Sequence, residues 1–221
     1  GKTRTVAQLL DITDRKKAEE LNLEMMKNLR RALDSTINVI ALTVEARDPF
    51  TSGHQRRVAD LARMIATEMR LPKDSIEAIR SAAIIHDLGK IHVPADILNK
   101  PSKLTEVEFN FIKAHPQVAY NILKDIEFPW PVAEIIYEHH ERWNGSGYPR
   151  GLSGQDILLE ARILAVADVV EAMASHRPYR PPLGIDKALE ELVENRDQLY
   201  DPDVVDACLR VFTEKHYTFK P

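Results

Sequence analysis

The middle of the chain carries the stretch Ser81-Ala-Ala-Ile-Ile-His86-Asp87-Leu-Gly-Lys90. Its first part is small and apolar, which is typical of a buried helical segment, and an imidazole and a carboxylate follow directly. A buried carboxylate without compensation costs several kcal/mol. The stretch therefore predicts a helix in the core, with Asp87 at a site that neutralises its charge.

A second carboxylate, Asp168, interrupts the apolar stretch Arg162-Ile-Leu-Ala-Val-Ala-Asp168-Val-Val-Glu-Ala-Met173. Divalent metal ions offer the compensation that both carboxylates need, because they bind imidazole nitrogen and carboxylate oxygen together. Further histidines lie at or inside helical runs. The candidate ligands are His54, His86, Asp87, His115, His139, His140 and Asp168. This set is too large for one tetrahedral ion and fits two ions that share a bridging carboxylate.

Two pairs of these candidates are adjacent in sequence. Consecutive helical residues point about 100° apart, so such pairs suit a site that straddles two ions. A lone histidine is more often a surface residue or a hydrogen-bonded core residue. We place His92, His176 and His216 in that class, and any single candidate ligand taken alone could belong there too.

The rest of the chain is helical by its apolar period, apart from a short strand-like segment at residues 3–12. A long helix is expected from Thr13 to Glu45, before the break at Asp48-Pro49. Further helices are expected roughly at 54–69, 74–86, 105–124, 131–142, 156–175, 186–194 and 203–213. The sequence thus predicts an all-α fold.

Composition limits the classes of partner. The 221 residues are 44% hydrophobic and can bury one core, while a net charge of −4 with scattered Lys and Arg argues against a nucleic acid polymer. The single cysteine, Cys208, cannot form an intrachain disulfide. No apolar run approaches the roughly 20 residues of a membrane span. We expect a cytoplasmic protein without membrane contact, and a start at Gly1 rather than Met suggests part of a longer chain.

Several motifs in register resemble the HD-GYP branch of the HD phosphohydrolase superfamily. They are Arg47-Asp-Pro-Phe-Thr-Ser-Gly-His54, His86-Asp87-Leu-Gly-Lys90, His115-Pro116, His139-His140-Glu141, Asn144-Gly-Ser-Gly147-Tyr148-Pro149, Val166-Ala-Asp168 and Ser175-His-Arg177-Pro-Tyr-Arg180. The resemblance runs from about Leu33 to Phe212. It implies an HD-domain helical bundle with extra C-terminal helices, preceded by a long N-terminal signalling helix.

The resemblance also implies an activity, namely hydrolysis of cyclic di-GMP to pGpG and/or GMP by a hydroxide that two divalent ions activate. Iron or manganese is the expected metal, with nickel, zinc or magnesium as substitutes. Carried over position by position, the ligands are the seven residues named above, and Asp87 and Lys90 are the implied catalytic residues.

Substrate contacts are implied for Lys90, Gly147, Tyr148, Pro149, Arg177 and Arg180. An aromatic ring at Tyr148 suits stacking on a guanine base, and the two arginines suit phosphate. A structural turn and a solvated pair are the competing interpretations. Some family members carry a Glu that supports a third metal where this chain has Phe50, so two metals are predicted.

The N-terminal residues Leu10-Asp-Ile-Thr-Asp-Arg-Lys-Lys-Ala-Glu-Glu20 resemble the end of a PAS sensor domain that passes into a signalling helix. This resemblance implies a sensor tail at 1–13, a signalling helix at 14–34 and the HD-GYP domain at 35–221, with the sensor acting in cis. An amphipathic stripe from Leu21 to Ile40 predicts a homodimer through this helix. Packing of the helix on its own domain would produce the same stripe.

Two alternatives remain open on the sequence. Another HD-type phosphohydrolase, acting on a different nucleotide, would keep the metal ligands but would not need the Gly147-Tyr148-Pro149 loop or the two arginines. A non-catalytic nucleotide-binding or scaffolding module could use the same fold, although loss of ligands is the usual mark of such a module.

Overall fold

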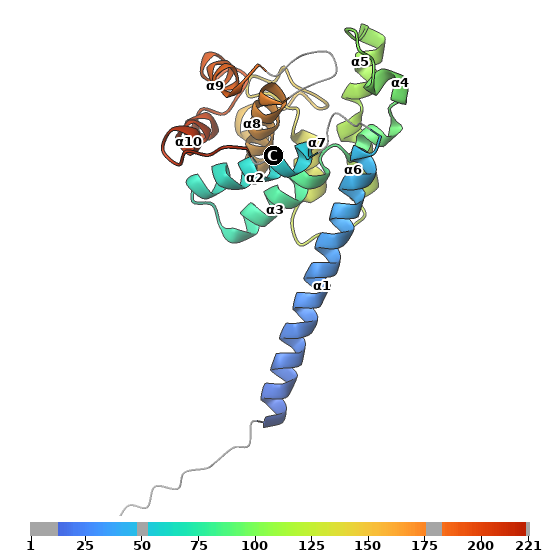
Figure 1. Cartoon of the computed structure of the whole chain (residues 1–221), viewed down its shortest axis with the longest axis vertical. Helices are drawn as coiled ribbons and strands as arrows, with labels where there is room; N and C mark the ends of the chain where they lie inside the picture. The colour runs from blue at the N-terminus through green and yellow to red at the C-terminus, as the bar shows by residue number, and fades with distance from the viewer. Residues whose placement is uncertain (1–12, 48–52, 176–182, 220–221) are drawn as a thin grey trace, which may run out of the picture. The chain divides into compact units, whose positions relative to one another are not determined.

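The computed structural model describes residues 13–47, 53–175 and 183–219, and these form helices joined by loops (Figure 1). No strand occurs in these ranges, where the sole β-type pairing is an isolated bridge between Arg196 and Tyr200. The predicted all-α fold is confirmed. The strand-like segment at 3–12, and with it most of the proposed sensor tail, lies outside the described residues.

The first helix, α1, runs from Thr13 to Glu45, as the sequence predicts. The chain divides into two compact units, Gly1–Asn38 and Val39–Pro221. Within the first unit, α1 exposes large apolar side chains, with Leu21 at 62%, Met26 at 65% and Leu29 at 65% exposure. Among the described residues of that unit, none covers the apolar stripe of α1.

The core of the second unit is built around α2 (His54–Glu68), α3 (Lys73–Ile85) and α8 (Leu159–Ala174). α2 packs against both α3 and α8, and α7 (Val132–Glu138) packs against α3 and α8. The largest fully buried side chains of these helices are Leu61, Ile65, Ile79, Ile85, Ile135, Ile136, Ile163 and Leu164. Branched aliphatic packing thus fixes the helix ends that carry the candidate ligands.

Two C-terminal helices, α9 (Ile185–Glu194) and α10 (Pro202–Thr213), pack on α8. α10 begins at an N-cap, Asp201, whose side chain accepts a hydrogen bond from the Asp203 backbone N–H. Cys208 lies buried on α10, and burial raises the pKa of its thiol to about 12. The thiol is therefore protonated and packs as a small apolar side chain.

The single helix expected at 105–124 is two helices, α5 (Glu106–Lys113) and α6 (His115–Leu123). Pro116 has no N–H to donate to the carbonyl of Ile112, and the His115 Nδ1 contacts that carbonyl oxygen instead at 2.7 Å. The prediction of one helix was wrong because the apolar period continues across the break. The start of α5 carries a capping box between Thr105 and Glu108.

Other boundaries also differ from the periodicity. α7 ends at Glu138 rather than at 142, and α8 begins at Leu159 rather than at 156. The connections contain the short helices η2 (Leu88–His92), α4 (Ala95–Leu98) and η3 (Gly154–Asp156). No helix in the described ranges is long and apolar enough to cross a bilayer.

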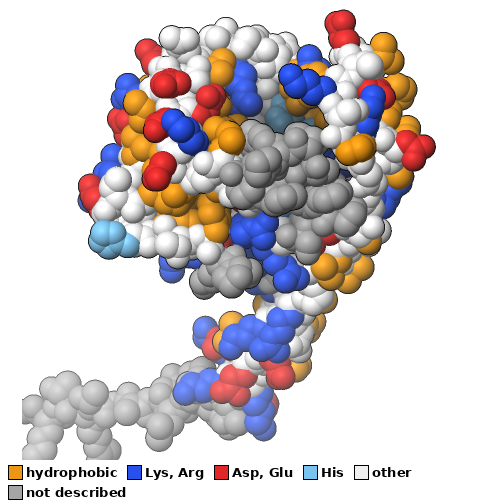
Figure 2. Space-filling model, turned by 45° about the horizontal axis from the view of Figure 1, so that its top comes forward, with side chains coloured by type: hydrophobic (Ala, Val, Ile, Leu, Met, Phe, Trp, Pro, Cys, Tyr) orange, Lys and Arg blue, Asp and Glu red, His pale blue; other side chains and the backbone are white. Residues whose placement is uncertain are grey.

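Side chains of both charge signs are interspersed over the face of the molecule in Figure 2, where the described Lys and Arg residues form no continuous stripe. Neutralisation of a nucleic acid backbone requires such a stripe.

Candidate metal centre

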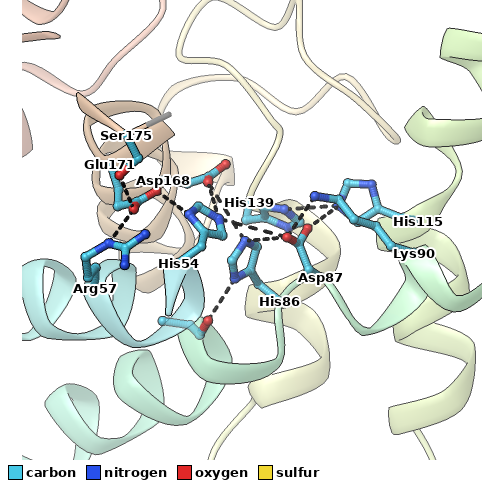
Figure 3. A network of polar contacts seen from close by, with 11 residues as sticks. His54, Arg57, His86, Asp87, Lys90, His115, His139, Asp168, Glu171 and Ser175 are labelled. Atoms are coloured by element: carbon cyan, nitrogen blue, oxygen red, sulfur yellow. Dashed lines mark hydrogen bonds and ion pairs between the residues drawn. The ribbon is translucent and has the colours of Figure 1, made fainter. Parts of the chain in front are cut away.

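The structure brings all seven predicted ligands together. The ligand atoms form three groups, and within each group all atoms lie within 4.8 Å of one another. The groups share members, and together they include every candidate. The groups are His54, His86 and Asp87; His86, His139 and Asp168; and His115, His139 and His140. The side chains come from α2, the end of α3, the start of α6, the end of α7 and α8, and most of them are drawn in Figure 3.

Asp87 lies between two sets of histidines. Its Oδ2 is 3.5 Å from His86 Nε2 and 3.9 Å from His54 Nε2, whereas its Oδ1 is 3.7 Å from His115 Nε2. Two ligands of one ion, each about 2.1 Å from it, lie about 3.0–3.4 Å apart. The distances from the Asp87 oxygens to the histidine nitrogens exceed this range by less than 1 Å. After small movements, Oδ2 could therefore bind one ion together with His54 and His86, and Oδ1 a second ion together with His115.

Asp168 closes the other side of the centre. Its Oδ1 is 3.3 Å from His54 Nε2 and 3.8 Å from His86 Nε2. Burial opposes ionisation of Asp168, but its hydrogen bond with His54 and the charge of His86 outweigh burial, so its pKa lies well below the ordinary value. Asp168 is therefore a carboxylate at neutral pH.

Three of the histidines are oriented in the same way. The Nδ1 atoms of His86, His115 and His139 contact the carbonyl oxygens three residues earlier, at 2.8, 2.7 and 2.6 Å. Because a carbonyl accepts, each Nδ1 carries a proton, so whenever such a ring is neutral its lone pair lies on Nε2. These helix-end contacts therefore aim three ligand atoms into the centre.

The Nε2 atoms of His115 and His139 face each other at 3.4 Å. Burial lowers the pKa of His115 to about 4 and that of His139 to about 3, so both rings are neutral at pH 7. With both protons on Nδ1, neither Nε2 can donate to the other, and two lone pairs oppose each other. A cation bound by both nitrogens resolves this repulsion, so the donor set fits a divalent metal ion.

His54 is held by a network that the sequence did not predict (Figure 3). Its Nδ1 contacts Glu171 Oε2, while Glu171 Oε1 accepts from Arg57 Nε at 2.7 Å and from Ser175 Oγ at 2.6 Å. Burial alone would lower the pKa of His54, but contacts with Asp168 and Glu171 raise it to about 9. The sequence contains a signal for Glu171, because this carboxylate lies in the same apolar run as Asp168, three residues later and therefore on the same helix face. The structure shows that Glu171 is buried.

Lys90 lies at the centre, and its Nζ donates to Asp87 Oδ2 at 2.8 Å. Burial opposes ionisation of Asp87, but the charges of His86 and Lys90 outweigh it, so the pKa of Asp87 is well below its ordinary value. Lys90 and Asp87 are joined through η2, which packs on α6. The predicted catalytic pair is therefore in contact, and its catalytic role stays a prediction.

The Gly147-Tyr148-Pro149 loop is anchored by two buried glutamates. Glu141 accepts hydrogen bonds from the backbone N–H groups of residues 150, 151 and 152 at 2.7, 3.2 and 3.0 Å. Glu138 accepts from the Leu158 N–H at 2.8 Å and from Arg150 Nη2 at 2.6 Å. Carboxylates thus hold the loop in place beside His139 and His140.

Tyr148 stacks on a candidate ligand rather than lying free. Its ring centroid is 4.8 Å from that of His140, with an angle of 27° between the rings. Gly147 allows this approach, because a Cβ there would lie 2.4 Å from Arg142 N and from Glu141 Cα. Tyr148, Gly147 and Pro149 thus lie at the centre, whereas Arg177, Arg180 and Phe50 lie outside the described residues.

Comparison with known proteins identifies the family. The family model for the HD domain matches residues 38–204 of this chain. The chain belongs to the HD domain family. The resemblance to HD phosphohydrolases is thereby confirmed at the level of this family.

This chain is also similar to proteins that bear the name of phosphodiesterases. It is 42% identical over 194 residues to the cyclic di-GMP phosphodiesterase response regulator RpfG of Xanthomonas campestris, covering 87% of this chain and 51% of the relative. It is 40% identical over 184 residues to a cyclic di-GMP phosphodiesterase of Thermotoga maritima, covering 82% and 50%. The chain spans about half the length of these relatives.

A solved structure with the same fold is the cyclic GMP-AMP specific phosphodiesterase V-cGAP3 of V. cholerae. The TM-score is 0.55 at 31% identity, and the match covers 84% of this chain and 42% of that one. The HD-domain helical bundle with its extra C-terminal helices is thus shared with a solved phosphodiesterase structure.

Replacing Glu141 by alanine is expected to destabilise this HD domain. Three backbone N–H groups would lose a carboxylate acceptor, and hydrogen bonds to a charged group contribute about 1.5–3 kcal/mol each. We expect a loss of at least about 2 kcal/mol in the free energy of unfolding, measured by urea denaturation. Glu134→Ala is the matched control, because Glu134 is exposed on α7 and should change stability by less than about 0.5 kcal/mol. Equal effects of the two substitutions would contradict the anchoring role.

Proposed function

We propose that this chain is a metal-dependent phosphodiesterase that hydrolyses cyclic di-GMP to pGpG and/or GMP. The observation that carries the proposal is the convergence of five imidazoles and two carboxylates, with the lone pairs of His115 and His139 opposed at 3.4 Å. A centre of this composition suits divalent cations, and a pair of such ions can catalyse phosphodiester cleavage. The names of the relatives supply the class of substrate.

The proposed residents of the centre are two divalent ions, iron or manganese, with nickel, zinc or magnesium as substitutes. When bound, such a pair supplies a hydroxide nucleophile at neutral pH and stabilises the charge on phosphorus. Mixed imidazole and carboxylate donors without thiolate suit these metals. His54, His86 and Asp168 would hold one ion, His115, His139 and His140 the other, and Asp87 would contact both.

The remaining residues act on the substrate in this proposal. Lys90, which now donates to Asp87, is close enough to the centre to contact the phosphate and stabilise the leaving oxygen. Tyr148 would place its ring beside a guanine base, and one face of that ring is covered by His140. Gly147 and Pro149 shape the loop, and Arg177 and Arg180 are the proposed phosphate clamp.

We extend the proposal to the whole chain. Residues 1–13 would be the tail of a PAS sensor acting in cis, residues 14–34 a signalling helix and residues 35–221 the HD-GYP domain. The exposed apolar side chains of α1 support pairing with α1 of a second copy as a homodimer. A signal from the sensor would then reach the HD domain through the paired helices.

The cyclic dinucleotide 3′3′-cGAMP is a second candidate substrate, because a V. cholerae relative that is 37% identical to this chain is named a 3′3′-cGAMP-specific phosphodiesterase, and the similar solved structure is named a cyclic GMP-AMP specific one. Protein loaded anaerobically with Fe²⁺ or with Mn²⁺ should be assayed on cyclic di-GMP, cGAMP and nucleoside triphosphates. We expect pGpG or GMP to form from cyclic di-GMP, with the highest kcat/KM of the panel. Cleavage of another nucleotide without cleavage of cyclic di-GMP would contradict the proposal, and binding without turnover would support a scaffold.

A further inference from the structure

Lys113 places a positive charge beside the metal centre. It is the last residue of α5, and His115 follows two residues later at the start of α6. Its Nζ lies 5.6 Å from the ring centroid of Tyr148 and 5.0 Å from that of Phe109. Because Tyr148 stacks on His140, the Lys113 ammonium borders the loop that flanks the candidate ligands.

The charge of Lys113 is not matched by a carboxylate in the described part of the chain. Lys90 pairs with Asp87 and Lys100 with Glu108, whereas within the described residues the Lys113 ammonium lies over aromatic rings and forms no ion pair. Aromatic faces attract and orient a cation but do not neutralise it. Lys113 is therefore held in place and remains able to bind an anion.

We propose that Lys113 binds the second, uncleaved phosphodiester of the cyclic dinucleotide. This inference rests on the proposed function. A cyclic dinucleotide carries two phosphodiesters in one small ring, so the second remains near the centre when the first lies at the ions. Lys90, at the centre, is the cation for the cleaved phosphate, and Lys113 lies beside Tyr148, in the loop proposed to contact the base.

The test removes the charge while keeping the contacts of the side chain. Lys113→Met preserves packing on the rings of Phe109 and Tyr148, since methionine is flexible and favours aromatic neighbours. We expect KM for cyclic di-GMP to rise at least about tenfold, as for loss of a charge-assisted contact. Lys113→Arg keeps the charge and should stay within about threefold of the wild type. Lys113→Gln is a second, independent removal of the charge with the same expected result as Lys113→Met.

A substrate with a single phosphate distinguishes binding of the second phosphodiester by Lys113 from a direct role of Lys113 in cleavage. For bis(p-nitrophenyl) phosphate, the loss of kcat/KM in Lys113→Met should be about tenfold smaller than for cyclic di-GMP. Lys73→Met, at the exposed start of α3, is the matched control and should leave both substrates unaffected. Cleavage of cyclic di-GMP by the wild type with an unchanged KM in Lys113→Met and Lys113→Gln would overturn this inference alone. Absence of cleavage by the wild type would overturn the proposed function, and this inference with it.

Discussion

Replacing Asp87 by alanine is expected to empty the metal centre and to lower turnover of cyclic di-GMP by more than about a thousandfold. Its two oxygens face different histidines, Oδ2 towards His54 and His86 and Oδ1 towards His115, so a single substitution weakens both proposed ions. Loss of a mere supporting contact already costs metal sites about 10–100-fold. Metal content per chain and steady-state kinetics measure the two effects.

Two further variants make this result specific. Asp87→Asn keeps the size of the side chain and should lose metal as well, because a neutral amide is a poorer ligand than a carboxylate. Asp206→Ala removes an exposed carboxylate that pairs with Arg196, and it should leave both metal content and turnover unchanged. A folded Asp87→Ala variant with wild-type metal content would refute the assignment of Asp87 as a shared ligand.

Replacing Gly89 by alanine is expected to cost at least about 3 kcal/mol in the free energy of unfolding and to lower turnover by more than about a hundredfold. A Cβ at this position would lie 1.9 Å from the carbonyl oxygen of His115 and 2.9 Å from the backbone N of Ala119. Both are backbone atoms of α6, so η2 and α6 must separate. His115 would then move out of the centre. Urea denaturation measures the loss of stability, and steady-state kinetics measure the loss of turnover.

Gly154→Ala is the matched control, because it is also a glycine-to-alanine substitution but creates no steric clash. A Cβ there would meet no atom within 4 Å, although its φ of +54° makes alanine strained by about 1–2 kcal/mol. Turnover should stay near that of the wild type. If Gly89→Ala proved no more costly than Gly154→Ala, the close contact between η2 and α6 would not exist as described.

The sequence predicts the centre better than it predicts the surrounding contacts. A carboxylate at the end of an apolar run, as at Asp87, requires a partner wherever the run is buried, and this argument needs no knowledge of the fold. The same reasoning applies to Glu171, which lies in the apolar run of Asp168 and contacts His54. The family motifs include the ligand His54 but not Glu171, the residue that contacts it, so the resemblance did not identify Glu171.

The break between α5 and α6 shows why helix boundaries are harder. Pro116 is a local signal of the break, yet apolar residues continue with helical spacing on both sides, so the period alone predicts one helix. Likewise, the anchoring roles of Glu138 and Glu141 depend on a loop that approaches them from residues 150–158. Such contacts arise from tertiary packing and leave no periodic pattern.

The most direct test of the metal centre is anomalous diffraction from crystals of metal-replete protein. We predict two strong peaks per chain on either side of Asp87, one beside His54, His86 and Asp168 and the other beside His115, His139 and His140. The absence of a peak among these side chains, or three fully occupied peaks, would contradict the account.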